Sequence, residues 1–129
     1  MSSGAHIITT IMELIELKST LNQLKAQYEE ASTMTTCDGI KHNVEIIIKD
    51  PNGHNIGVQK SGSGEYQFIT DTTGLKPKDL KAQNKFVNAI KQKYAYNKVI
   101  AELKRQGYQI AQEQKVDNDT IKLVARRWK

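Results

Sequence analysis

The sequence contains a single cysteine, Cys37, only two prolines, and no long apolar run. One cysteine excludes an intrachain disulfide framework and is typical of proteins from a reducing compartment. No run of large apolar residues is longer than Ile46-Ile47-Ile48, whereas a membrane helix needs roughly 20 apolar residues. The first residues lack the basic and apolar regions of a secretory signal. These absences predict a protein of the cytoplasm, or of an organelle interior of bacterial descent, that does not insert in a membrane.

Acidic residues are scarce in the second part of the chain. Residues 1–75 contain five lysines, no arginine and nine acidic residues, whereas residues 76–129 contain fourteen basic and five acidic residues. The net charges of the two parts are therefore −4 and +9, which agrees with +5 for the whole chain. This asymmetry predicts an anionic partner for the second part, whether a nucleic acid, a nucleotide or an acidic protein surface. The alternative is that the two parts neutralise each other within the fold.

Apolar spacing predicts the order of helices and strands. The chain has the length of one domain, and we expect a single α+β domain over residues 1–129. A short strand over residues 6–10 and a helix from Met12 to about Ala31 come first, followed by a loop. Alternating residues then predict strands around 44–48, 56–58 and 66–70, with turns at DPNGHN and SGSGE. A long helix over 78–106, ended by Gly107, precedes strands around 108–110 and 121–125.

Helix followed by strand, turn and strand occurs twice, in the halves 6–75 and 76–129, which is consistent with an internal pseudo-repeat. We therefore predict a mostly antiparallel sheet of five or six short strands covered by two helices. The long helix has apolar residues on two nearly opposite faces, which predicts packing on both sides and favours a homo-oligomer. One face holds Phe86, Val87, Ile90 and Tyr94, and the other holds Tyr96, Val99, Ile100 and Leu103.

No motif of an enzyme, metal site or cofactor site is evident. Cys37, His42 and His54 lack the paired short spacings of zinc sites. The KSGSGE segment leads into a predicted strand, whereas a phosphate-binding loop leads into a helix. Ser61 and Ser63 lack the motif that surrounds a catalytic serine. We therefore predict no metal, no cofactor and no catalytic residue, which favours a protein that is not an enzyme.

Basic side chains are the strongest candidates for a binding surface. Lysines and arginines on a rigid frame contact phosphates, and an exposed tryptophan can stack on a base. The alternative is that these residues are only solvated and that the tryptophan covers a core edge. The chain has no signature of a known nucleic-acid-binding module. The candidate anion-binding residues are Lys91, Lys98 and Arg105, which recur every seven residues, with Arg126 and Arg127, and the candidate stacking residue is Trp128.

We predict a non-enzymatic binding or adaptor module that contacts an acidic protein or a nucleic acid through its basic C-terminal half. The alternative is a small-ligand-binding protein or a minor enzyme, with a pocket between the long helix and the sheet. Salt-dependent binding of an anionic partner distinguishes the first function from the second.

The segment QKYAYNKVIAELKRQGY, followed by a hairpin that ends in IKLVARRW, resembles the C-terminal half of the hypothetical chloroplast reading frame thirty-five family. This family of unknown function occurs in cyanobacteria, red-algal plastid genomes and diverse bacteria. NIGVQKSGSGEYQFITD is similar to its central hairpin, and HIITTIMELIELKSTLNQL resembles its opening strand and helix. Family members often carry a tryptophan where this chain has Thr72-Thr73-Gly74. The resemblance implies a compact cytoplasmic or plastid protein and supplies no catalytic residues.

Overall fold

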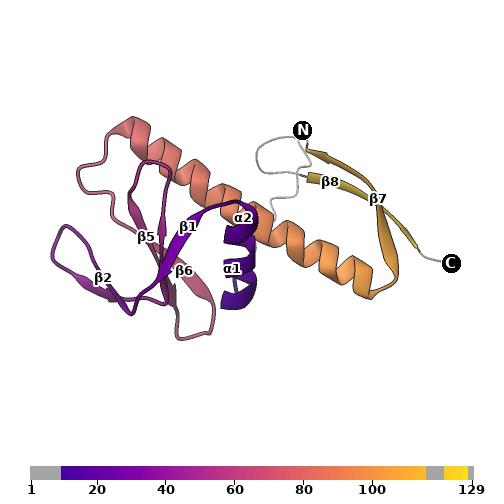
Figure 1. The fold of residues 1–129 in the computed structure, drawn as a ribbon, viewed down its shortest axis with the longest axis horizontal. Helices are drawn as coiled ribbons and strands as arrows, with labels where there is room; N and C mark the ends of the chain where they lie inside the picture. Colours follow the sequence, from indigo (N-terminus) through magenta and orange to yellow (C-terminus); the bar gives the residue numbers. More distant parts are fainter. Residues whose placement is uncertain (1–9, 116–120, 128–129) are drawn as a thin grey trace. The chain divides into compact units, whose positions relative to one another are not determined.

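The computed structural model describes residues 10–115 and 121–127 and confirms the α+β class (Figure 1). The chain forms two compact units, which we call the sheet unit, Thr10–Val87, and the hairpin unit, Asn88–Lys129 with Met1–Thr9. The elements of the described residues are α1 (Leu14–Gln23), β1 (Gln27–Glu30), β2 (Thr33–Thr35), β3 (Lys41–Asn43), β4 (Ile46–Lys49), β5 (Asn55–Lys60), β6 (Tyr66–Thr70), α2 (Pro77–Arg105), β7 (Tyr108–Lys115) and β8 (Ile121–Arg127).

The strands form three antiparallel sheets in place of the one sheet that the sequence predicted. In the sheet unit, β1, β4, β5 and β6 lie in that order in a four-stranded sheet, and β2 pairs with β3. In the hairpin unit, β7 pairs with β8. Six strands follow α1 and two follow α2 within the described residues, so the two predicted halves differ in strand number.

One face of the four-stranded sheet carries the main core of the sheet unit. Ile46 pairs with Val58 and Ile48 pairs with Ile56, and these four side chains are almost completely buried. Because side chains alternate along a strand, all four lie on the same face. Leu17 and Leu21, one turn apart on α1, are also fully buried.

The opposite face of the same sheet carries a second, smaller core. It consists of Met34 from β2, Val44 and Ile47, with Ala31 and Ile69 packed against it. Ile47 alternates with the isoleucines of the main core, which explains why three consecutive residues of β4 are buried. The β2–β3 hairpin therefore contributes Met34 to this face through a strand that the sequence assigned to a loop.

Helix α1 is shorter than predicted, because the chain leaves it before Ala31. The helix ends at Gln23, and Lys25 adopts a left-handed backbone conformation with φ of 56°. The following residues form β1, in which Tyr28 pairs with Ile48 of β4. The prediction that the helix continues to about Ala31 is therefore wrong, because strand pairing replaces its last turns.

Helix α2 agrees with its predicted bounds. It begins at Pro77, whose missing N–H costs nothing at the first helical position, and Gly107 follows its end with φ of 87°.

Strands β7 and β8 confirm the last predicted strands, and β7 has a bulge between Ile110 and Gln112. The predicted turn at 117–119 and the predicted strand at 6–10, apart from Thr10, fall outside the described residues.

A buried polar contact joins the β4–β5 turn to the first part of α2. Asp50 is 4% exposed and accepts hydrogen bonds from the backbone N–H groups of Asn52 and His54, each at 2.9 Å. Gln83, also buried, donates from Nε2 to Asp50 Oδ2 at 3.3 Å. Within the sheet unit, this contact holds the first part of α2 in position relative to the β4–β5 turn.

The two apolar faces of α2 are buried to different extents. Ile90 and Tyr94 are buried, while Tyr96 and Ile100 are half-buried and Val99 is 37% exposed. The homo-oligomer that these two faces favour stays a prediction. Light scattering that detects only monomer would contradict it.

Candidate anion-binding surface

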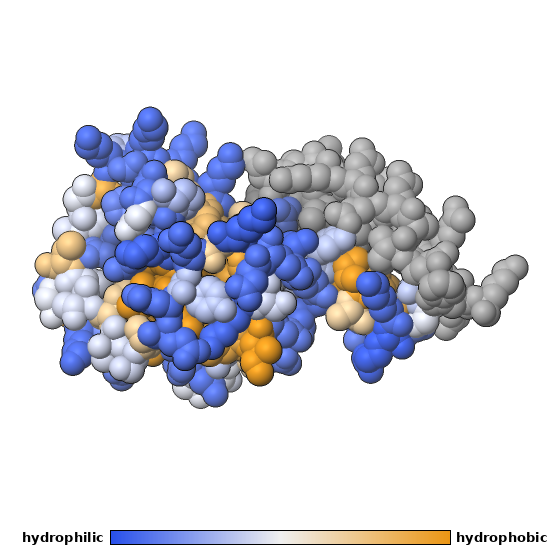
Figure 2. Space-filling model, viewed as in Figure 1, coloured by the Kyte–Doolittle hydropathy of each residue, from blue (hydrophilic) through white to orange (hydrophobic). Residues whose placement is uncertain are grey.

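The basic residues of the chain concentrate in the hairpin unit. Its sequence contains ten lysines and arginines and four acidic residues, which gives a net charge of +6. The sheet unit contains nine lysines and ten acidic residues, which gives −1. The charge asymmetry of the sequence therefore coincides with the division into units. Hydrophilic residues also cover most of the described surface on the face that Figure 2 shows.

Three candidate residues, Lys91, Lys98 and Arg105, lie on α2 in the hairpin unit and are exposed. We call them the basic row. A spacing of seven residues corresponds to about two helical turns, so neighbouring members are about 10 Å apart along the helix axis. The row is therefore long enough to meet several separate anionic groups of a partner.

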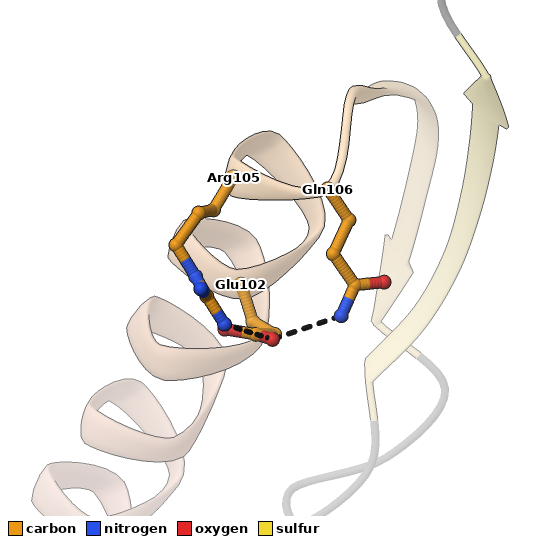
Figure 3. Close-up of polar contacts among 3 residues, drawn as sticks. All are labelled: Glu102, Arg105 and Gln106. Atoms are coloured by element: carbon orange, nitrogen blue, oxygen red, sulfur yellow. Dashed lines mark hydrogen bonds and ion pairs between the residues drawn. The ribbon is translucent and has the colours of Figure 1, made fainter.

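Glu102 interrupts the basic row near its C-terminal end. Arg105 donates from Nη2 to Glu102 Oε1 and Oε2 at 2.6 and 2.7 Å and from Nε to Oε2 at 3.1 Å. Gln106 Nε2 donates to Glu102 Oε1 at 2.8 Å, so the two donors approach the carboxylate from different sides (Figure 3). The Arg105 side chain is nevertheless 74% exposed and that of Glu102 49% exposed. The pair therefore lies within reach of a partner.

These contacts set the ionisation of the pair. The hydrogen bonds from Arg105, and then that from Gln106, lower the pKa of Glu102, and the charge of Lys98 adds to the effect. Glu102 in turn raises the pKa of Arg105. Sequence reasoning missed Glu102, although its position four residues after Lys98 and three before Arg105 is the spacing of helical ion pairs.

The end of α2 brings other basic positions close to Arg105 along the chain. Lys104 and Arg105 form the last turn of α2, where positive charge stabilises the helix dipole. In the hairpin that follows, Tyr108 pairs with Arg127 and Gln109 with Arg126. The backbone of both β8 arginines therefore lies opposite the residues that directly follow α2. Trp128, the predicted stacking residue, lies outside the described residues.

The tyrosines of α2 do not form open stacking platforms. Tyr94 is 1% exposed. Tyr96 is half-buried, and the ammonium group of Lys93 lies 4.7 Å from the centre of its ring. A cation over the ring face occupies the surface on which a base would stack.

Cys37 belongs to a polar contact between two loops of the sheet unit. Its backbone N–H donates to Asp71 Oδ2 at 2.6 Å, and the Thr73 N–H donates to Asp71 Oδ1 at 3.1 Å. These bonds, led by that from the Cys37 N–H, lower the pKa of Asp71 from 3.8 to about 2. Hydrogen bonding to Asp71 raises the pKa of the exposed Cys37 thiol. The contact stabilises the loops and leaves the thiol weakly nucleophilic at neutral pH.

The structure also describes the positions considered above for a metal site and for a phosphate-binding loop. Among residues 10–115 and 121–127, no group of three His, Cys, Asp or Glu residues could hold a metal ion. The KSGSGE segment forms the predicted turn between β5 and β6, closed by hydrogen bonds from Ser61 N to Glu65 O and from Gly64 N to Ser61 O.

Within the described part of the chain, no helix has an apolar segment that could span a membrane.

Comparisons with known proteins agree on one group of relatives. The family model described as "Protein of unknown function (DUF1257)" matches residues 20–124. The uncharacterized protein ycf35 of Pyropia yezoensis is 32% identical over 99% of this chain and 98% of its own length. The ycf35 proteins of Cyanophora paradoxa and Guillardia theta are 28% and 29% identical, each over 100% of this chain and 99% of their own length. No solved structure matches the chain.

Proposed function

The chain belongs to the DUF1257 family of unknown function and is similar to the ycf35 proteins. We propose that it is a non-enzymatic binding module for an acidic partner. The basic row and the arginines of β8 form the proposed contact surface. The partner is an acidic protein or a nucleic acid, and the module acts as an adaptor that holds it. The single cysteine supports a reducing compartment such as the cytoplasm for this function.

The observation that carries the proposal is the net charge of +6 on the hairpin unit, with exposed lysines and an exposed arginine on α2. A rigid helix keeps the spacing of its cations fixed, so a partner with matching anions loses less entropy on binding. Long-range attraction of this kind also accelerates association.

The test replaces Lys91, Lys98 and Arg105 together by glutamate and measures binding to two labelled probes by fluorescence anisotropy. The probes are a 20-nucleotide single-stranded DNA and an acidic peptide. We expect affinity for at least one probe to fall steeply with salt in the wild-type chain, and to fall about tenfold or more in the triple variant.

A second triple variant provides the control. Lys78, Lys81 and Lys85 are also exposed on α2, but they belong to the sheet unit. Their replacement by glutamate changes the net charge by the same amount, so a similar loss of affinity in both variants would indicate a general charge effect. Binding that survives the substitution of the basic row would contradict the proposal.

A further inference from the structure

We infer that Glu102 determines the class of partner, so that the basic row selects a mainly acidic protein surface over a nucleic acid. The inference rests on the proposed function and adds the identity of the partner class to it. It depends on the contacts of Glu102 with Arg105 and Gln106 and on its position between Lys98 and Arg105 (Figure 3).

The charges along this part of α2 alternate in sign. Lys98 is followed by Glu102 after four residues and by Arg105 after three more, so the backbone position of Glu102 lies about 6 Å from that of Lys98 and about 4.5 Å from that of Arg105 along the helix axis. A partner that spans Lys98 and Arg105 must therefore also pass over Glu102.

A nucleic acid is poorly suited to this pattern. Its backbone presents only negative charge, and the planar fork of Arg105 that would bind a phosphate already binds both oxygens of Glu102. A phosphate would have to displace the carboxylate and would still lie beside it. Base stacking would not offset this cost on α2, because Tyr94 is buried and Tyr96 carries Lys93 on its ring.

A protein surface can complement all three charges. A partner carboxylate on Arg105 must also displace Glu102, but the same surface can offer a lysine or amide donor to the displaced Glu102, which a polyphosphate cannot do. Charge complementarity of this kind confers specificity, because a like charge placed opposite Glu102 is disfavoured. The half-exposed Glu102 carboxylate accepts three bonds from Arg105 and one from Gln106, so it can accept such a donor once a partner anion has taken Arg105.

The experiment compares Glu102→Gln with the wild-type chain on two labelled probes by fluorescence anisotropy over a range of salt. One probe is a 20-nucleotide single-stranded DNA. The other is a helical peptide with several glutamates seven residues apart and a single lysine between two of them, so that it is mainly acidic. Glu29→Gln in exposed β1 is the control, since it changes the net charge equally but lies in the sheet unit.

We expect opposite effects on the two probes. Glu102→Gln releases Arg105, so DNA affinity rises about threefold or more and the log–log salt slope becomes steeper by about 0.7, the value for one added phosphate contact. Affinity for the mixed-charge peptide falls, because its lysine loses Glu102. The control variant shifts both affinities slightly and in the same direction.

Three results would overturn the inference. The first is a wild-type chain that binds the DNA more tightly than the peptide at physiological salt. The second is a Glu102→Gln variant whose DNA affinity and salt slope are unchanged, and the third is a variant that shifts both probes in the same direction. In each of these cases salt-dependent binding persists, so the proposed function stands while the inference fails. If the wild-type chain binds neither probe, both fail.

Discussion

Val44 lies directly over Gly57 in the second core of the sheet unit. A Cβ atom on Gly57 would come within 2.8 Å of Val44 Cγ1, and within 3.1 Å of the Cε atom of Met34. The methionine is flexible and can move, but the valine is short and branched, so it cannot retreat without a shift of its backbone. The absence of a side chain at residue 57 therefore allows the β2–β3 hairpin to approach the sheet.

Gly57→Ala should destabilise the chain by about 1–3 kcal/mol, the usual cost of overpacking a core. Urea unfolding followed by circular dichroism measures the difference. Gly62→Ala is the matched control, because a Cβ there meets nothing within 4 Å and should change stability little. Val44→Ala in the Gly57→Ala background should restore part of the loss, and strictly additive effects of the two substitutions would contradict the contact.

Asp50→Ala should cost about 1–3 kcal/mol in unfolding free energy, because it leaves partly buried backbone N–H groups without their acceptor. Asp50→Asn should cost less. Its remaining oxygen still accepts from Asn52 and His54, and the buried Gln83 Oε1, which has no hydrogen-bond partner in the described structure, can turn to accept from the new amide. Equal losses for the two variants in urea unfolding would show that the charge of Asp50 matters more than its hydrogen bonds.

Asp71 should contribute to the acid sensitivity of the fold. Because its pKa of about 2 is below the ordinary value of 3.8, its ionised form stabilises the folded chain above about pH 4, and this contribution is lost as the pH falls through about 2. The difference in urea midpoint between the wild-type chain and Asp71→Asn should therefore be largest above pH 4 and shrink toward pH 2. A difference that stays constant over this range would contradict the assignment.

Cys37 should react slowly with iodoacetamide, because its raised pKa leaves little thiolate at pH 8. Asp71→Asn removes the main cause of the shift, so alkylation should become faster. The single cysteine makes the rate readable by mass spectrometry of the intact protein. Asp38→Asn is the comparison, since Asp38 is only the last contributor to the shift, and an equal acceleration in both variants would argue against the Asp71 contact.

Elements whose ends and faces depend on neighbouring residues in the sequence were predictable. Pro77 and Gly107 mark the two ends of α2, and the alternation of β5 and β6 is visible in the sequence. The end of α1 was not predictable in this way. The apolar spacing continues to Tyr28, and the turn that ends the helix uses Lys25 in a conformation typical of glycine. The pairing of β1 with β4, which are separate segments of the sequence, determines where α1 ends.

The candidate surface was predictable as a set of charges and not as a set of contacts. The seven-residue spacing of Lys91, Lys98 and Arg105 follows from the sequence, and all three are exposed. The same segment contains Glu102 at ion-pair spacing, but spacing alone does not show that Gln106 also binds the carboxylate. Gln106 lies four residues after Glu102, and its N–H donates to the Glu102 carbonyl at 3.1 Å, so the helical path continues far enough to place the two side chains together.

Helix α2 crosses the boundary between the sheet unit and the hairpin unit, at Val87 and Asn88. A gene fragment cut at this boundary would encode a helical remnant of eleven residues on one side and eighteen on the other. The eleven-residue remnant is shorter than the roughly 12–15 residues below which an isolated helix is marginal, and both fragments would lose the helical hydrogen bonds that cross the cut. An exchange of one unit at this boundary would therefore interrupt α2. The relatives from Pyropia yezoensis, Cyanophora paradoxa and Guillardia theta match almost the whole chain, so their similarity extends across this boundary.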